Sequence, residues 1–221
     1  MQQVDLLRSL PKAKRNINAR KSTKTPEMIA IAKQYGEEYF DGPREFGYGG
    51  YKYDGRWWSV AVNIINHYDL GIGARILDVG CAKGFLVNDL MYAVPSLEAF
   101  GLDISRYAIM HCFPPNVIGR LHLGSADDLP FPDQSFDLVL SINTLHNLPR
   151  SRLIRALQEI NRVSRSRGNA FVQVDSYNTP EQKELFEDWV LTAEYHGYPE
   201  DWLELFRDAG YTGDYDWTIV E

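Results

Sequence analysis

The sequence has few cysteines and no long hydrophobic run, and each absence excludes a class of protein. Only Cys81 and Cys112 occur among its 221 residues, so a disulfide framework and the paired-cysteine spacing of structural metal sites are both absent. No apolar stretch approaches the length that spans a bilayer, and the first residues lack the apolar core of a secretory signal. We therefore expect a cytoplasmic protein with no membrane span and no bound metal.

Positive charge is also scarce, except near the N-terminus. The net charge is −7, although residues 1–33 carry eight Lys or Arg side chains, Lys12 and Lys14 among them. The acidic body argues against a dedicated nucleic-acid-binding protein, because phosphate contacts require clustered positive charge. The basic arm is suited to an acidic substrate, a partner subunit or the acidic body itself, and it also fits a solvated terminus.

The most informative segment is residues 76–90, which combine an apolar run, a glycine-containing turn and the start of a helix. The run contains Asp78 near its end and is typical of a buried parallel strand. Gly80 and Gly84 bracket the turn and allow a ligand to approach the backbone closely. Ala82 replaces the second glycine of the G-x-G-x-x-G pattern that seats a pyrophosphate. The segment therefore favours a ligand without a pyrophosphate, and Asp78 suits one with an ammonium group beside a nucleoside, such as S-adenosylmethionine (SAM).

Two further segments follow in order. Residues 99–105 are typical of a second strand that ends near Asp103, about 20 residues beyond Gly84, which is the spacing of a carboxylate that binds ribose hydroxyls. Residues 124–137 then lead into an apolar strand at 138–143. The ordered motifs D-V-G-C-x-x-G, G-L-D-I-S and A-x-x-L-P-F-x-D-x-S-F-D resemble those of a class I SAM-dependent methyltransferase.

This resemblance implies an α/β fold, with a Rossmann-like, doubly wound, mostly parallel sheet and an antiparallel last strand. Residues 61–221 would form this core, and residues 1–60 would form a basic arm with a helical and aromatic cap or lid. Only one strand is expected after the last helix. The sequence thus indicates a six-stranded sheet or an edge completed by a partner subunit, and it is compatible with a homodimer.

The resemblance also implies a SAM site, with S-adenosylhomocysteine (SAH) as the product. Asp103 would bind both ribose hydroxyls, and Ile104 would lie against the adenine ring. The backbone amide of Ala126 would meet the adenine edge. Relatives usually have glycine at position 82 and often aspartate at position 125, so the acceptor for the adenine amino group is left open between Ser125 and Asp127. The expected set is Asp78, Gly80, Cys81, Ala82, Gly84, Asp103, Ile104, Ser125, Ala126, Asp127 and Asn143.

The segment before the first motif has a different composition. Residues 26–40 show helical spacing of apolar side chains and are predicted to form one amphipathic helix. Residues 41–58 place aromatic side chains between glycines, which favours a lid over a ligand, although the same rings would also attach the cap to the core. Arg56 would contact the acceptor or pair with the carboxylate of the cofactor. The side chains expected to contact the substrate are Tyr48, Tyr51, Tyr53, Arg56 and Trp57.

Three residues at the ends of two predicted strands are candidates to remove a proton from an acceptor hydroxyl. Methyl transfer to a hydroxyl requires alignment of the acceptor and a base. His146 follows the strand at 138–143, and histidine accepts protons near neutral pH, although this side chain would equally serve to fix its loop. Asp175 and Tyr177 follow a strand at 170–174 and form a second candidate pair.

Together these features predict SAM-dependent methyl transfer to a polar small-molecule acceptor, in particular to a hydroxyl of a carbohydrate or a secondary metabolite. Two alternatives stay open. An RNA methyltransferase is disfavoured by the acidic body and by the lack of an N-P-P-Y or D-P-P-Y motif. A catalytically silent SAM-binding partner subunit of another methyltransferase is compatible as well, because the cofactor motifs are clearer than the base.

Overall fold

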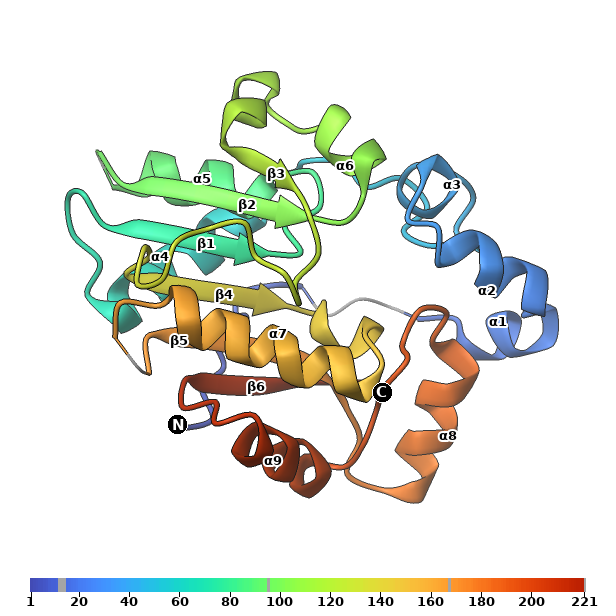
Figure 1. The fold of residues 1–221 in the computed structure, drawn as a ribbon. Coiled ribbons are helices and arrows are strands. Elements are labelled where there is room, and N and C mark those ends of the chain that lie inside the picture. The colour runs from blue at the N-terminus through green and yellow to red at the C-terminus, as the bar shows by residue number, and fades with distance from the viewer. Residues whose placement is uncertain (12–14, 95, 167, 221) are drawn as a thin grey trace.

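The computed structural model describes residues 1–11, 15–94, 96–166 and 168–220, so Lys12 and Lys14 of the predicted basic arm lie outside the described residues. From residue 57 onward, helices and strands mostly alternate along the chain, except that β4 follows β3 directly and α9 follows α8 (Figure 1). The strands are β1 (Arg75–Val79), β2 (Glu98–Asp103), β3 (Leu121–Leu123), β4 (Leu138–Ile142), β5 (Ala170–Ser176) and β6 (Asp214–Ile219). The helices are α1 (Ile17–Thr23), α2 (Pro26–Ala32), α3 (Glu37–Phe40), α4 (Trp57–Tyr68), α5 (Phe85–Ala93), α6 (Arg106–Met110), α7 (Arg150–Val163), α8 (Pro180–Trp189) and α9 (Pro199–Asp208), with short 3-10 turns η1 (Pro115–Arg120) and η2 (Leu145–Asn147).

The six strands form one sheet in the order β3-β2-β1-β4-β5-β6, and every neighbouring pair is parallel. Asp78 of β1 lies between Gly101 of β2 and Leu140 of β4. Because the strands are parallel, their carboxyl ends meet at one edge of the sheet, where open α/β sheets bind ligands. The doubly wound α/β fold predicted from the sequence is confirmed.

The orientation of the last strand differs from the prediction. Phe171 of β5 pairs with Asp214 of β6, and Ser176 pairs with Ile219, so β6 is parallel to β5 and the expected antiparallel last strand is wrong. The physical reason is the connection between them. The chain passes through α8 and α9 before β6 begins, and a crossover of this kind returns it to the starting end of the sheet.

The N-terminal residues lie along the outer edge of β6. The Val4 amide donates to the Tyr215 carbonyl at 2.9 Å, and the Tyr215 amide donates to the Gln2 carbonyl at 3.1 Å. These bonds satisfy backbone groups that an edge strand otherwise exposes. At this point the sheet edge is covered by the chain itself.

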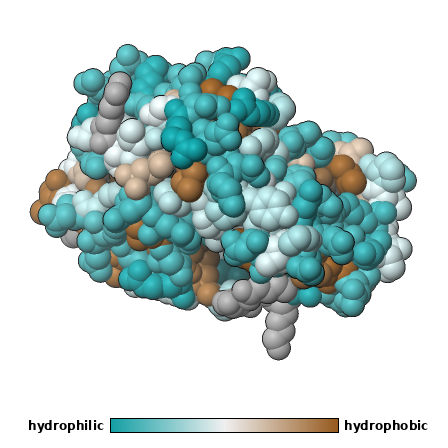
Figure 2. All heavy atoms as spheres, turned by 90° about the horizontal axis from the view of Figure 1, so that it is seen from below, coloured by the Kyte–Doolittle hydropathy of each residue, from teal (hydrophilic) through white to brown (hydrophobic). Residues whose placement is uncertain are grey.

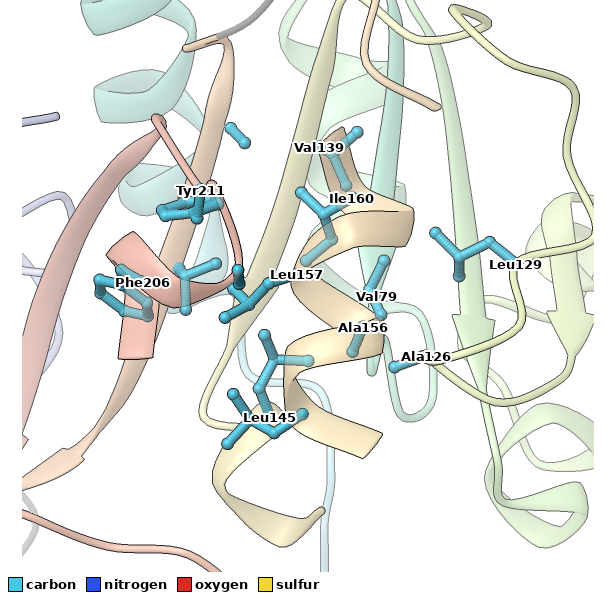
Figure 3. Close-up of a cluster of buried hydrophobic side chains, with 14 of the residues drawn as sticks. Val79, Ala126, Leu129, Val139, Leu145, Ala156, Leu157, Ile160, Phe206 and Tyr211 are labelled. Carbon is cyan, nitrogen blue, oxygen red and sulfur yellow. The ribbon is translucent and has the colours of Figure 1, made fainter. Parts of the chain in front are cut away.

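The hydrophobic core has two layers, one on each face of the sheet. Alternating side chains along β1 enter different layers, because successive residues of a strand point to opposite faces: Ile76 packs with α4 and α5, whereas Leu77 packs with α7 and α9. Figure 3 shows the second layer, in which Ala156, Leu157 and Ile160 of α7 lie against the sheet. The apolar side of α7 therefore faces the core.

The N-terminal cap is less regular than predicted. Residues 26–40 form α2 and α3 instead of one helix, because Tyr35 has a left-handed backbone with φ of +50° and Gly36 begins a new helix. The predicted boundary at residue 60 lies inside α4. Figure 1 shows α1 beside α8, so the cap also touches the C-terminal part of the chain.

The surface carries few hydrophobic groups on the face drawn in Figure 2, where hydrophobic side chains are scattered among hydrophilic ones. Among the helices of the described residues, none combines the length and the apolar character that a membrane span requires.

Candidate active site

Two adjoining cavities lie at the carboxyl edge of the sheet. The larger has a volume of about 930 Å³ and lies between the ends of β1, β4, β5 and β6 and the N-terminal segment. The smaller has a volume of about 190 Å³ and lies beside the ends of β2 and β3. Both are lined by Tyr39, Tyr48, Gly80, Ala82, Asn143, Thr144 and Asn147. Seven shared residues make the two cavities neighbouring compartments of one site.

The turn after β1 forms the wall between the compartments. Gly80 has φ of +87°, and a Cβ atom there would lie 2.0 Å from Thr144 Oγ1, so only glycine fits. Ala82 also has a left-handed backbone, with φ of +49°, which is strained for a residue with a side chain. Gly84 precedes α5 with φ of +76°. Burial raises the pKa of the Cys81 thiol well above its usual value, which excludes a thiolate in this turn.

Asp103 connects this turn to the smaller cavity. Its Oδ2 accepts a hydrogen bond from the Ala82 amide and its Oδ1 accepts one from the Ser105 amide, each at 2.7 Å. The side chain is buried, and burial raises its pKa. The neighbouring Ile104 is exposed and lines the same cavity. A fixed carboxylate beside an apolar side chain is suited to a ribose next to an aromatic base.

The loop after β3 contributes Ser125 and Ala126 to the smaller cavity, but the Asp127 carboxylate points elsewhere. Arg152 donates to both oxygens of Asp127 at 2.8 Å, and Ser125 Oγ donates to Oδ1 at 2.5 Å. The Arg152 hydrogen bond holds the pKa of Asp127 far below its usual value. This carboxylate is committed to Arg152, which itself lines the cavity and was not predicted from the sequence.

Asp78 is the buried carboxylate of the larger cavity. It is 5% exposed, and no hydrogen bond from the described residues reaches its oxygens. Burial, together with the nearby Asp103, raises the pKa of Asp78 to about 7. A carboxylate without a protein partner at the edge of a cavity is suited to a cationic group of a ligand.

Two buried amide oxygens at the same edge also lack partners among the described residues. They are Asn147 Oδ1 and Gln173 Oε1, and both residues line the larger cavity. Asn147 belongs to both compartments, so its free acceptor lies where a ligand would cross from one to the other. Asn143, which was predicted, accepts a hydrogen bond from Thr218 Oγ1 at 2.8 Å.

His146 and Asp175 form a pair in the wall of the larger cavity. His146 Nδ1 accepts a hydrogen bond from the Asp175 amide at 3.2 Å, and His146 Nε2 lies 3.4 Å from Asp175 Oδ2. The amide donor fixes Nδ1 as an acceptor, so the proton of the neutral ring is on Nε2, next to the carboxylate. The lone pairs that can accept a proton from a ligand in the cavity are therefore those of the Asp175 carboxylate. The His146 ring orients this carboxylate.

Tyr177 does not line either cavity. Its hydroxyl lies 3.0 Å from His196 Nδ1, its ring packs against Phe186 of α8, and burial raises its pKa to about 12. The alternation along β5 would place it on the same side as Asp175, but β5 ends at Ser176 and the chain turns into α8. The structure brings Asp175 to the cavity and Tyr177 to the core.

Four of the five predicted cap residues line the larger cavity: Tyr48, Tyr51, Arg56 and Trp57. Tyr48 is 43% exposed, and it lines both cavities. Tyr53 is the exception, because its hydroxyl donates to Asp89 at 2.7 Å and its ring stacks on Phe113, outside the cavity.

The cap is joined to the turn after β1. The ring of Tyr51 stacks on Phe85 with centroids 4.8 Å apart, and Lys83 Nζ lies 2.6 Å from Asp41 Oδ2. Arg56 pairs with Asp54. Among the residues described, no cluster of His, Cys, Asp and Glu side chains has the arrangement of a metal site.

Comparison with known proteins identifies the family of this site. Residues 77–172 match the family described as "Methyltransferase domain", and this stretch contains the turn after β1, Asp103 and the loop after β3. Residues 77–172 therefore form a methyltransferase domain, and the sheet around them has the class I SAM-dependent methyltransferase fold. Enzymes of this class use SAM as the methyl donor.

Two curated relatives of this methyltransferase domain act on lipids according to their names. The chain is 35% identical over 124 residues to the fatty-acid O-methyltransferase of Mycolicibacterium smegmatis, a match that covers 54% of this chain and 44% of that protein. It is 35% identical over 102 residues to the phthiotriol/phenolphthiotriol dimycocerosates methyltransferase of Mycobacterium tuberculosis, covering 45% and 37% of the two chains. The chain thus spans less than half the length of either relative.

Solved structures show the same fold. The YcgJ protein of Bacillus subtilis has a TM-score of 0.55 and 23% identity, covering 67% of this chain and 66% of its own. The [4+2]-cyclase SpnF has a TM-score of 0.52 and 21% identity, covering 69% and 57%. A cyclase with this fold means that the fold alone does not establish the reaction.

Proposed function

We propose that this chain transfers a methyl group from SAM to an oxygen atom of a small-molecule acceptor bound in the larger cavity. One observation carries the proposal: the two compartments meet at the turn after β1, and the larger also contains the carboxylate of Asp175. Ligand pockets commonly measure about 300–1,000 Å³, so a cavity of about 930 Å³ accommodates an acceptor beside the amino-acid end of the cofactor.

The residues fit SAM in both compartments. In the proposal Asp103 binds the ribose hydroxyls, and Ile104, Ser125 and Ala126 surround the adenine. Asp78 holds the ammonium group of the cofactor, because its buried carboxylate lines the larger cavity and accepts no hydrogen bond from the described residues. When bound, SAM supplies an electrophilic methyl group.

The acceptor side is built by the cap and by the ends of β4 and β5. Tyr48, Tyr51 and Trp57 provide aromatic walls that exclude water, and Asp175 takes the proton of an acceptor hydroxyl while His146 holds the carboxylate in place. We favour hydroxyls of carbohydrates and secondary metabolites as acceptors, because the wall of the cavity combines aromatic and polar side chains. Fatty acids are also tested as acceptors, because one curated relative is named a fatty-acid O-methyltransferase.

An acceptor screen with methyl-labelled SAM tests this function. The panel contains sugars, phenolic metabolites, hydroxylated fatty acids and an RNA transcript, and SAH release and mass spectrometry are the readouts. We expect label on an oxygen of a small molecule. Label on RNA alone would support the RNA alternative. A chain that binds SAH but labels an acceptor only when a second methyltransferase subunit is added would be a catalytically silent partner.

The affinity for SAH is expected to fall by about tenfold from about pH 8 to about pH 6. The carboxyl of Asp78 has a pKa of about 7 without ligand, so it gains a proton as the pH falls through that value. The protonated form cannot pair with the ammonium group, so binding is strong above about pH 7 and weak below it. Calorimetry at both pH values measures the change, and Asp78→Asn should bind weakly at each. A wild-type affinity that does not vary with pH would contradict the assignment.

Amide hydrogens of residues 41–58 are expected to exchange more slowly when SAH is present. Tyr48 and Tyr51 of this segment line the cavity, so a bound ligand would hold the segment closed. Hydrogen exchange with mass spectrometry gives the comparison, and α9, which contributes no lining residue, is the internal control. Equal exchange with and without SAH would mean that the segment only attaches the cap to the core.

A further inference from the structure

Three arginines gather around one indole ring in the larger cavity. The guanidinium carbons of Arg15, Arg20 and Arg44 lie 5.9, 4.3 and 5.2 Å from the ring centre of Trp189. Arg15 precedes α1, Arg20 belongs to α1, Arg44 lies in the segment after α3, and Trp189 ends α8. All four side chains line the larger cavity, and none lines the smaller one. We call these four residues the arginine cluster.

Two of these guanidinium groups, those of Arg20 and Arg44, donate hydrogen bonds to backbone carbonyls. Arg20 is only 8% exposed, and its Nη2 donates to the Arg44 carbonyl at 2.5 Å. Arg44 Nη1 in turn donates to the Gly47 carbonyl. Burial and the neighbouring Arg44 lower the pKa of Arg20, and burial lowers the pKa of Arg44. Like charges have therefore been brought together at an electrostatic cost.

The indole compensates for part of this cost, because its face attracts cations. Within the described parts of the chain, no carboxylate lies within 4.0 Å of the three guanidinium groups. Arg56 in the same cavity differs, because Asp54 neutralises it. A guanidinium has five N–H donors in a planar fork that matches the oxygens of a carboxylate or a phosphate.

We propose that the arginine cluster binds an anionic oxygen group, a carboxylate or a phosphate, of the acceptor. This inference rests on the acceptor cavity of the proposed function and adds the charge of the substrate to it. The cluster holds one end of the acceptor at the junction of α1 and α8, while the oxygen to be methylated faces Asp175. An acidic substrate is also the ligand that a basic arm on an otherwise acidic protein would attract.

The carboxylate of the cofactor is the competing occupant, and the test separates it from an acceptor. Sodium phosphate and sodium octanoate are titrated by calorimetry into SAH-saturated protein at constant ionic strength. The variants are Arg20→Gln and Arg44→Gln. Arg120→Gln is the matched control, because its guanidinium lies 5.1 Å from the Phe100 ring but lines neither cavity. The affinity for SAH is measured for every protein.

We expect saturable binding of at least one probe, weakened about tenfold or more in both cluster variants and unchanged in Arg120→Gln. Phosphate binding alone indicates a phosphorylated acceptor, and octanoate binding alone indicates a carboxylate on an apolar chain. Should Arg20→Gln fail to fold, Arg44→Gln carries the test, because Arg44 is on the exposed side of the cluster.

Three results would overturn the inference: no binding of either probe by the wild-type protein, equal binding by the cluster variants, or a loss of SAH affinity in those variants. The last result would assign the cluster to the cofactor. Methyl transfer is not a readout here. A failed acceptor screen and a failed anion titration are therefore distinguishable.

Discussion

Replacing Asp103 by alanine is expected to weaken the binding of SAH by at least about tenfold. Each charge-assisted hydrogen bond contributes about 1.5–3 kcal/mol, and the two ribose hydroxyls would lose a shared acceptor. The substitution also removes the hydrogen bond that the Ala82 amide donates to Asp103 Oδ2, which holds the turn between the two cavities. Titration calorimetry measures the effect.

Two comparisons separate binding from folding in this experiment. Asp208→Ala, at the exposed end of α9, removes a carboxylate outside both cavities and should bind SAH as the wild-type protein does. Thermal unfolding of Asp103→Ala without ligand shows whether the turn survives. Unchanged SAH affinity in a folded Asp103→Ala protein would contradict the ribose assignment.

Replacing Asp175 by asparagine is expected to lower turnover by about 10² to 10⁴ while SAH affinity stays nearly constant, because a general base contributes a factor of that size. His146 Nδ1 is engaged by the Asp175 amide, so the carboxylate is the group with free lone pairs. His146→Ala should therefore lower turnover less than Asp175→Asn does. The turnover number and the dissociation constant of SAH, measured on the same preparations, give the comparison.

The control for this pair is Asp69→Asn, an exposed carboxylate at the end of α4. A larger loss for His146→Ala than for Asp175→Asn would return the role of base to the histidine. Turnover within about threefold of wild type for both variants would mean that alignment alone drives transfer.

The parallel sheet was predictable because its signals are local. The apolar run at 76–79 and the glycines at 80 and 84 lie within one short segment, and the structure places β1, a left-handed turn and α5 there. The direction of β6 was not predictable in this way. It depends on how α8 and α9 cross the sheet, and the family resemblance suggested a different last strand.

The site residues also differ in whether a local sequence motif predicts them. The motif residues Asp78, Asp103 and Ser125 do line the cavities. Tyr53 and Tyr177 have hydroxyl groups and lie in segments whose composition suggested a binding site. Their side chains nevertheless point to Asp89 and to α8. The direction of a side chain in an irregular segment depends on contacts that the sequence pattern does not contain.

The arginine cluster shows the limit of local patterns. Arg20 and Trp189 are separated by most of the chain, and they meet only because α1 packs beside α8. A basic arm was visible in the sequence, whereas its convergence on one ring required the tertiary structure. Asn147 was missed for a related reason, since an unpartnered buried oxygen is a property of the folded site.

The most direct measurement of the central claim, that the two cavities form one SAM-dependent methyltransferase site, is calorimetric titration of the purified chain with SAH near pH 8. We expect saturable binding of one ligand per chain with a dissociation constant in the micromolar range, and weaker binding by Asp103→Ala and Asp78→Asn. An absence of saturable binding up to millimolar SAH would contradict it.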